Sequence, residues 1–172
     1  HISNLRVIVG TGLYSSTFTP STTPLTAVAN TQLLTCQSST FIDNSNNNIK
    51  ITAASSTVKP LLVSPFTPTA NTGLSYSPST FSGSMYFDGA GDYVTANSSA
   101  IYSMGTGDFT VEMWVYLSNA PNTNNISLFA FDAGNANQTN GGLDQLAMTG
   151  VTSPTNGWKL YWYNGGPATV EL

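Results

Sequence analysis

The chain has 172 residues, of which 40% are hydrophobic and only 7% are charged, with four Lys and Arg against eight Asp and Glu. A chain of this length can bury about 70% of its unfolded surface, which is enough for one domain with a proper core. Its four cations are scattered, at Arg6, Lys50, Lys59 and Lys159. Because binding to phosphates needs clustered cations, the composition argues against a nucleic-acid-binding protein.

Residue counts exclude further classes of protein. No run of 18 or more apolar residues occurs, so the sequence predicts no transmembrane helix. Cys36 is the only cysteine, which rules out an intrachain disulfide and a thiolate metal cluster. His1 is the only histidine, and it stands at the start of the sequence, so a hydrolytic triad is not expected.

Short predicted strands, separated by turns rich in Gly, Asn and Pro, follow one another along the whole chain. They cover residues 2–9, 31–37, 49–52, 58–63, 109–117, 126–131, 143–148, 158–163 and 168–172. Pro20 and Pro24 exclude a helix or a central strand from the segment after residue 12, which we interpret as an extended surface connection. Strands at this spacing predict an all-β antiparallel sandwich.

The clearest strand is 109–117, because its side chains alternate with period two. One face carries Phe109, Val111, Met113, Val115 and Leu117, and the other carries Thr110, Glu112, Trp114 and Tyr116. Burial of the five apolar side chains would contribute roughly 1.5–3 kcal/mol each. We therefore expect this strand at the centre of a sheet. Before it, Gly89 and Gly91 between two aspartates predict a tight connection with positive φ angles.

Two motifs resemble a known family. Residues 87–94 read FDGAGDYV and residues 108–115 read DFTVEMWV. This pairing is similar to the laminin-G-like branch of the concanavalin A-like lectin/glucanase superfamily, and residues 43–48 resemble the polar turn that precedes it. The resemblance implies a jelly-roll sandwich of two antiparallel sheets over residues 31–172, incomplete at its C-terminal end.

Residues 1–30 resemble a different part of such a domain, namely the closing strand and linker that end a preceding module. Modules of this kind are joined in tandem in virion and tail-fibre proteins of marine cyanobacterial phages. The resemblance implies that residues 2–9 pair beside residues 84–96, either in the same chain or in a neighbouring copy. The alternative is that residues 1–28 are only the tail of a preceding repeat.

Two carboxylates on the clearest strand raise the question of glycan hydrolysis. Retaining glycosidases hold their two carboxylates about 5–5.5 Å apart. Asp108 and Glu112 lie four positions apart, which corresponds to about 13 Å along a strand. We interpret Asp108 as a turn residue and Glu112 as part of a polar face, and we expect no enzyme activity.

Two kinds of ligand remain open. Carboxylates in Gly- and Asn-rich turns could hold calcium, although they could equally serve their own turns. These candidates are Asp88, Asp92, Asp132 and Asp144. Aromatic side chains could form a platform for glycans, or could pack in the core. These candidates are Trp114, Tyr116, Tyr161, Trp162 and Tyr163, with Trp158 nearby.

The sequence and the resemblance together predict a non-enzymatic structural and adhesive module of a phage virion or fibre protein, exposed on the virion surface or otherwise extracellular. Its expected partners are other copies or modules of the same protein and host surface glycans, without nucleic acid or membrane insertion. No cofactor is required, and calcium is an option. The alternatives are a secreted bacterial lectin or adhesin and a degenerate protein of the glycanase fold.

Overall fold

The computed structural model describes residues 1–66, 78–97, 100–102, 106–118, 126–130, 144–151, 157–164 and 169–171. From residue 144 onward, and at residues 78, 79, 100 and 126, this description covers the backbone alone. The chain forms two compact units, His1–Tyr116 and Leu117–Leu172.

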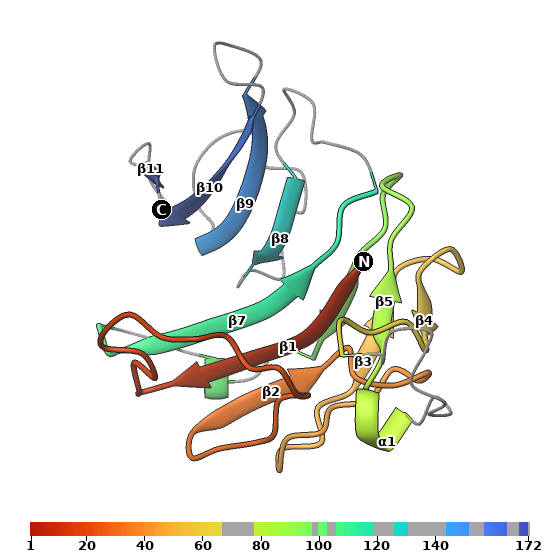
Figure 1. The fold of residues 1–172 in the computed structure, drawn as a ribbon, viewed down its shortest axis with the longest axis horizontal. Helices are drawn as coiled ribbons and strands as arrows, with labels where there is room; N and C mark the ends of the chain where they lie inside the picture. The colour runs from red at the N-terminus through yellow and green to blue at the C-terminus, as the bar shows by residue number, and fades with distance from the viewer. Residues whose placement is uncertain are drawn as a thin grey trace. The chain divides into compact units, whose positions relative to one another are not determined.

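In its described residues, the first unit contains strands and two single-turn helices (Figure 1). Its strands are β1 (Ile2–Val9), β2 (Thr31–Thr35), β3 (Ile51–Ala53), β4 (Lys59–Leu61), β5 (Ser84–Tyr86), β6 (Val94–Ala96) and β7 (Phe109–Val115). Its helices are α1 (Pro78–Phe81) and the 3-10 helix η1 (Ala100–Tyr102). All described strand pairings are antiparallel, which confirms the predicted all-β class.

Strand β1 is the central strand of the main sheet (Figure 1). One of its edges pairs with β7 from Ile2 to Val9. Its other edge pairs first with β5, where Ile2 faces Met85, and then with β2. Residues 2–9 thus pair within this chain, beside residue 85. The expectation that 109–117 forms the centre of the sheet is wrong, because β1 pairs on both edges with β2, β5 and β7, whereas β7 is in register with β1 alone among the described residues.

Burial follows this arrangement. Every residue from Ser3 to Ile8 is buried, so both faces of β1 are covered. Val7, Ile8 and Met85 have no exposed surface, and burying side chains of this size contributes roughly 1.5–3 kcal/mol each before the entropy cost. The core of the first unit therefore surrounds β1.

Asn4 interrupts the regular alternation of β1. It has a φ of 53° and is fully buried, and the register against β7 shifts between Ser3 and Arg6. Its amide nitrogen donates to the hydroxyls of Ser3 and Ser82 at 2.9 and 3.1 Å, and its amide oxygen accepts from Leu25 N at 2.9 Å. Asn tolerates this left-handed conformation better than most residues, and its side chain here connects three segments.

The predicted polar turn after β2 is organised by Asp43, which is 4% exposed. Its carboxylate accepts hydrogen bonds from Leu34 N at 3.0 Å, from Ser45 N at 2.8 Å and from Ile49 N at 2.9 Å. Aspartate commonly closes turns in this way. The turn brings the chain back toward β3, which pairs with β6 in a two-stranded sheet.

The second unit contains β8 (Ile126–Ala130), β9 (Asp144–Val151), β10 (Gly157–Asn164) and β11 (Thr169–Glu171). These strands form one sheet in the order β11-β10-β9-β8. Strand β10 lies between two neighbours, with Trp162 in register with Leu146 on β9 and with Val170 on β11. The four strands predicted here are confirmed, with shifted ends.

Among the described residues, no helix has the length and apolar character needed to cross a membrane.

Candidate functional site: an exposed aromatic row

Three strands of the first unit bring aromatic residues into one line. Ile2 is in register with Met85 on β5 and with Val115 on β7. One position further along, His1 lies between Tyr86 and Tyr116, and Tyr116 N donates to His1 O at 2.9 Å. Because alternate residues of a strand face opposite sides, these rings lie on the face opposite to the buried Met85.

The rings contact one another edge to face. The ring centroids of His1 and Tyr86 are 5.3 Å apart with an interplanar angle of 65°, and those of His1 and Tyr116 are 5.8 Å apart at 68°. Such pairs are favourable beyond their buried area. Tyr86 is 36% exposed and Tyr116 is 65% exposed. We call His1, Tyr86 and Tyr116 the aromatic row.

Two side chains of different character, Trp114 and Lys59, neighbour the aromatic row. Trp114, two residues before Tyr116 on the same face of β7, is half-buried and packs edge-on against Phe66 with centroids 5.1 Å apart. On the other side of the row, the exposed Lys59 is in register with Tyr86. Trp114 thus lies next to Tyr116 along β7, and Lys59 lies next to Tyr86 across the sheet.

Two of the predicted platform residues, Trp114 and Tyr116, belong to this face, and Tyr116 lies at the surface rather than in the core. The other three platform candidates, with Trp158, lie on β10 of the second unit, where the side chains fall outside the described residues. These are Tyr161, Trp162 and Tyr163. Sequence reasoning missed His1 and Tyr86, because only the register of β1 against β5 and β7 places them beside Tyr116.

Glu112 holds a structural ion pair on the same face of β7. Its carboxylate pairs with the guanidinium of Arg6, and Arg6 Nε donates to Glu112 Oε1 at 2.7 Å. The side chains of Arg6 and Glu112 are only 6% and 14% exposed. Arg6 also donates to Thr26 O at 2.7 Å. A carboxylate engaged in this way serves the fold, as the polar-face interpretation of Glu112 expects.

Cys36 shows no sign of reactivity. The side chain is 2% exposed, and burial raises the pKa of its thiol to about 12. Because the thiolate is the reactive form, this cysteine stays protonated and unreactive near neutral pH.

The carboxylates of Asp88 and Asp92 are both engaged in hydrogen bonds, those of Asp88 within the 88–92 loop and those of Asp92 both within it and to the segment after β3. Asp92 accepts from Asp88 N at 2.7 Å and from the hydroxyls of Ser55 (2.6 Å) and Thr57. Asp88 accepts from Ala90 N at 2.8 Å. Hydrogen bonds from Ser55, Thr57 and Asp88 N lower the pKa of Asp92 to about 2. This is the arrangement of turn-serving aspartates, and the positive φ angles predicted for the loop occur at its two glycines.

The other two calcium candidates belong to the second unit. Asp132 lies outside the described residues, and Asp144 begins β9, where only the backbone is described. No group of three or more His, Cys, Asp or Glu side chains suited to a metal occurs in the described part of the chain. Calcium binding stays a prediction for these residues.

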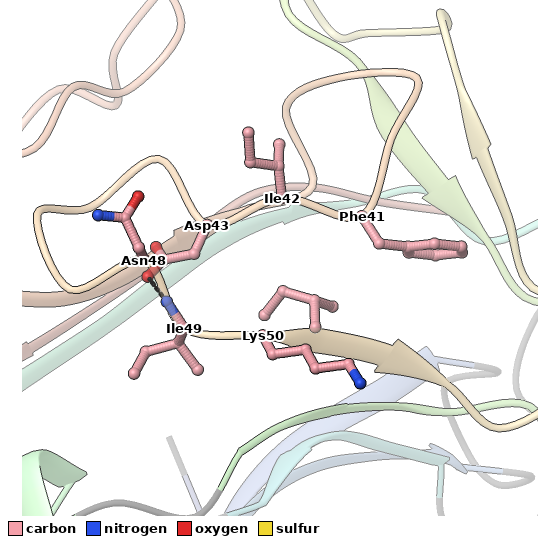
Figure 2. Close-up of a pocket in the computed structure, with 7 residues that line it drawn as sticks. Phe41, Ile42, Asp43, Asn48, Ile49 and Lys50 are labelled. Carbon is pink, nitrogen blue, oxygen red and sulfur yellow. Dashed lines mark hydrogen bonds between the residues drawn. The ribbon is translucent and has the colours of Figure 1, made fainter.

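A shallow hollow of about 330 Å³ lies beside the Asp43 turn (Figure 2). Its lining includes Phe41, Ile42 and Lys50. In Figure 2, Asp43 turns toward Ile49, whose backbone N donates to it, so its carboxylate is already engaged. The remaining polar side chains of the lining are those of Asn48 and Lys50, and we take the aromatic row as the stronger candidate site.

The described strands define an antiparallel all-β protein with an aromatic surface on its first unit. No family model matches this chain, and no curated protein or solved structure matches it.

Proposed function

We propose that this chain is a non-enzymatic adhesive module that binds glycans through the aromatic row. The observation that carries the proposal is the exposure of Tyr86 and Tyr116 on either side of His1, in edge-to-face contact. Sugars present apolar C–H faces as well as hydroxyl groups, so aromatic rings with polar edges suit them. A rigid aromatic side chain also binds at a low entropy cost, because it has only two side-chain torsions.

The wider setting of the proposal is a jelly-roll sandwich in a phage virion or fibre protein, located on the virion surface or extracellularly and assembled with neighbouring copies. The FDGAGDYV and DFTVEMWV motifs support this setting. A charged fraction of only 7% also fits a surface built from Ser, Thr and Asn. The alternative is a secreted bacterial lectin or adhesin. It would bind glycans with the same surface, but the chain would then belong to a bacterial protein instead of a virion or fibre protein.

A glycan array tests the binding function. The wild-type chain should bind one or more glycans, and the double variant Tyr86→Ala/Tyr116→Ala should lose at least tenfold in affinity. Tyr93→Ala is the matched control, because Tyr93 is a 50% exposed tyrosine of the same unit outside the row. Circular dichroism should show that all variants stay folded. Unchanged binding by the double variant, or no binding by the wild type, would contradict the proposal.

Electron microscopy of assembled particles labelled with an antibody against this chain tests whether the chain is part of a phage virion or fibre. Label on virions or fibres supports a virion module, whereas label confined to bacterial surfaces or medium supports the secreted lectin.

A further inference from the structure

A second exposed aromatic pair lies on the segment that follows β1. The rings of Tyr14 and Phe18 stack with centroids 3.8 Å apart and an interplanar angle of 11°. Tyr14 is 38% exposed and Phe18 is 50% exposed. The stacked pair, like the aromatic row, exposes apolar ring surface to solvent.

Hydrogen bonds fix this pair to β7. The Tyr14 hydroxyl donates to Glu112 Oε2 at 2.7 Å. Next to it, Leu13 N donates to Thr110 Oγ1 at 2.8 Å, and Thr110 Oγ1 donates to Thr11 O at 3.2 Å. Burial is the main cause that raises the pKa of Tyr14, and the hydrogen bond to Glu112 is the second. The Tyr14 hydroxyl therefore keeps its proton. The pair is therefore positioned by the strand.

The two aromatic sites lie on the same face of β7. Residues 110, 112, 114 and 116 lie on one face of β7, and residues 109, 111, 113 and 115 lie on the other. The register shift does not disturb this alternation, because its extra residue belongs to β1. Glu112, which holds Tyr14, and Tyr116 of the aromatic row are separated by about 13 Å along the strand. Between them lies Trp114 with Phe66 against it.

The surface between the two aromatic sites carries almost no net charge. Arg6 and Glu112 are the charged side chains there among the described residues, and they pair with each other while almost buried. Thr110 adds a hydroxyl near the Tyr14 end. Between the two sites a ligand therefore meets aromatic rings and uncharged polar groups, while the exposed charges of Lys59 and Asp108 lie outside this stretch, beside Tyr86 and Gly12.

We infer that the ligand is a neutral, linear oligosaccharide long enough to touch both the aromatic row and the Tyr14–Phe18 pair. The inference rests on the proposed glycan binding and specifies its substrate class. Each end supplies an exposed aromatic surface, and the strand sets the distance between them. A single sugar reaches only one end, so affinity should rise with chain length.

Isothermal titration calorimetry with neutral disaccharides and hexasaccharides of the cello-, laminari-, malto-, xylo- and chito-series tests this inference. A hexasaccharide should bind at least tenfold more tightly than its own disaccharide, and hexagalacturonate should bind more weakly than the neutral hexamer. Phe18→Ala should reduce the affinity for the hexasaccharide roughly twofold to tenfold, the range expected for one aromatic contact. It should leave the disaccharide affinity unchanged.

Tyr14→Phe is the matched control, because it keeps the stacked ring and removes only the hydrogen bond to Glu112. It should retain most of the affinity for the hexasaccharide, because the hydrogen bond from Leu13 N to Thr110 Oγ1 still holds the segment on β7. Equal affinity for disaccharide and hexasaccharide, or a Phe18→Ala variant that binds the hexasaccharide like the wild type, would overturn the inference. If Tyr116→Ala still abolishes binding in that case, the proposed function stands. If no hexamer in the series binds and the glycan array is also negative, both fail.

Discussion

Strands β1 and β7 are neighbours paired from one end to the other, yet they have different environments. Val7 on β1 has no exposed surface, whereas its register partner Val111 on β7 is half-exposed. All of β7 from Thr110 to Val115 is half-exposed. Regular alternation therefore identifies a strand but does not place it in the sheet.

The cause lies in the neighbours of each strand. β1 has β7 on one edge and β2 and β5 on the other, and the segment through Thr26 packs near it through Arg6. Within the described part of the chain, β7 is in register with β1 alone. Burial therefore concentrates on β1, and β7 keeps a face for the aromatic groups.

Loss of the ion pair that connects the two strands should destabilise the protein most. Arg6→Ala should lower the free energy of unfolding by about 3–5 kcal/mol, because it leaves the nearly buried Glu112 without its partner. Urea unfolding followed by tryptophan fluorescence measures this change.

The matched control is the double variant Arg6→Met/Glu112→Leu, which replaces both charges by apolar groups of similar size. It should recover most of the lost stability, since apolar replacement of a buried pair is often close to neutral. A loss below about 1 kcal/mol in Arg6→Ala would show that the pair is exposed to solvent in the folded protein.

The next prediction compares the loss of stability on truncating two register partners, Val7 on β1 and Val111 on β7. Val7→Ala should cost about 2–3 kcal/mol, because two buried methyl groups are lost and a cavity is left. Val111→Ala should cost about 1 kcal/mol, because its side chain is half-exposed. Equal losses in urea unfolding would contradict the assignment of β1 as the buried centre.

The smallest effect lies outside both strands, at Asp92. Its pKa is about 2 when folded, below the unfolded value of about 3.9. The carboxylate therefore stabilises the fold above pH 4, and this contribution is lost as the pH falls from about 4 to about 2. The melting temperature of Asp92→Asn should change less over this range than that of the wild type. Parallel curves would show that the Ser55 and Thr57 hydrogen bonds do not persist in solution.

Much of the fold could be predicted from local sequence. The strands at 2–9, 31–37 and 109–117 follow from β-branched residues and alternation, and the structure places strands in each. The tight connection at Gly89 and Gly91 follows from the conformational freedom of glycine, and both residues have positive φ angles. Pro60 lies on β4, a strand at the end of the described sheet, where the missing N–H is tolerated.

The candidate site could be predicted only in part. Trp114 and Tyr116 were recognised on one face because that needs only the period of a single strand. Tyr86 and His1 were missed, because their place beside Tyr116 depends on pairing between residues more than 80 positions apart. The role of Tyr14 depends in the same way on its distant partner Glu112.

The all-β class, the positions of most strands and the alternating faces of 109–117 follow from the sequence, because these features depend on neighbouring residues. The central place of β1 and the presence of two aromatic groups on one face of β7 follow from the fold alone. Burial and register depend on which distant strands pair, and local propensity carries little information on that choice.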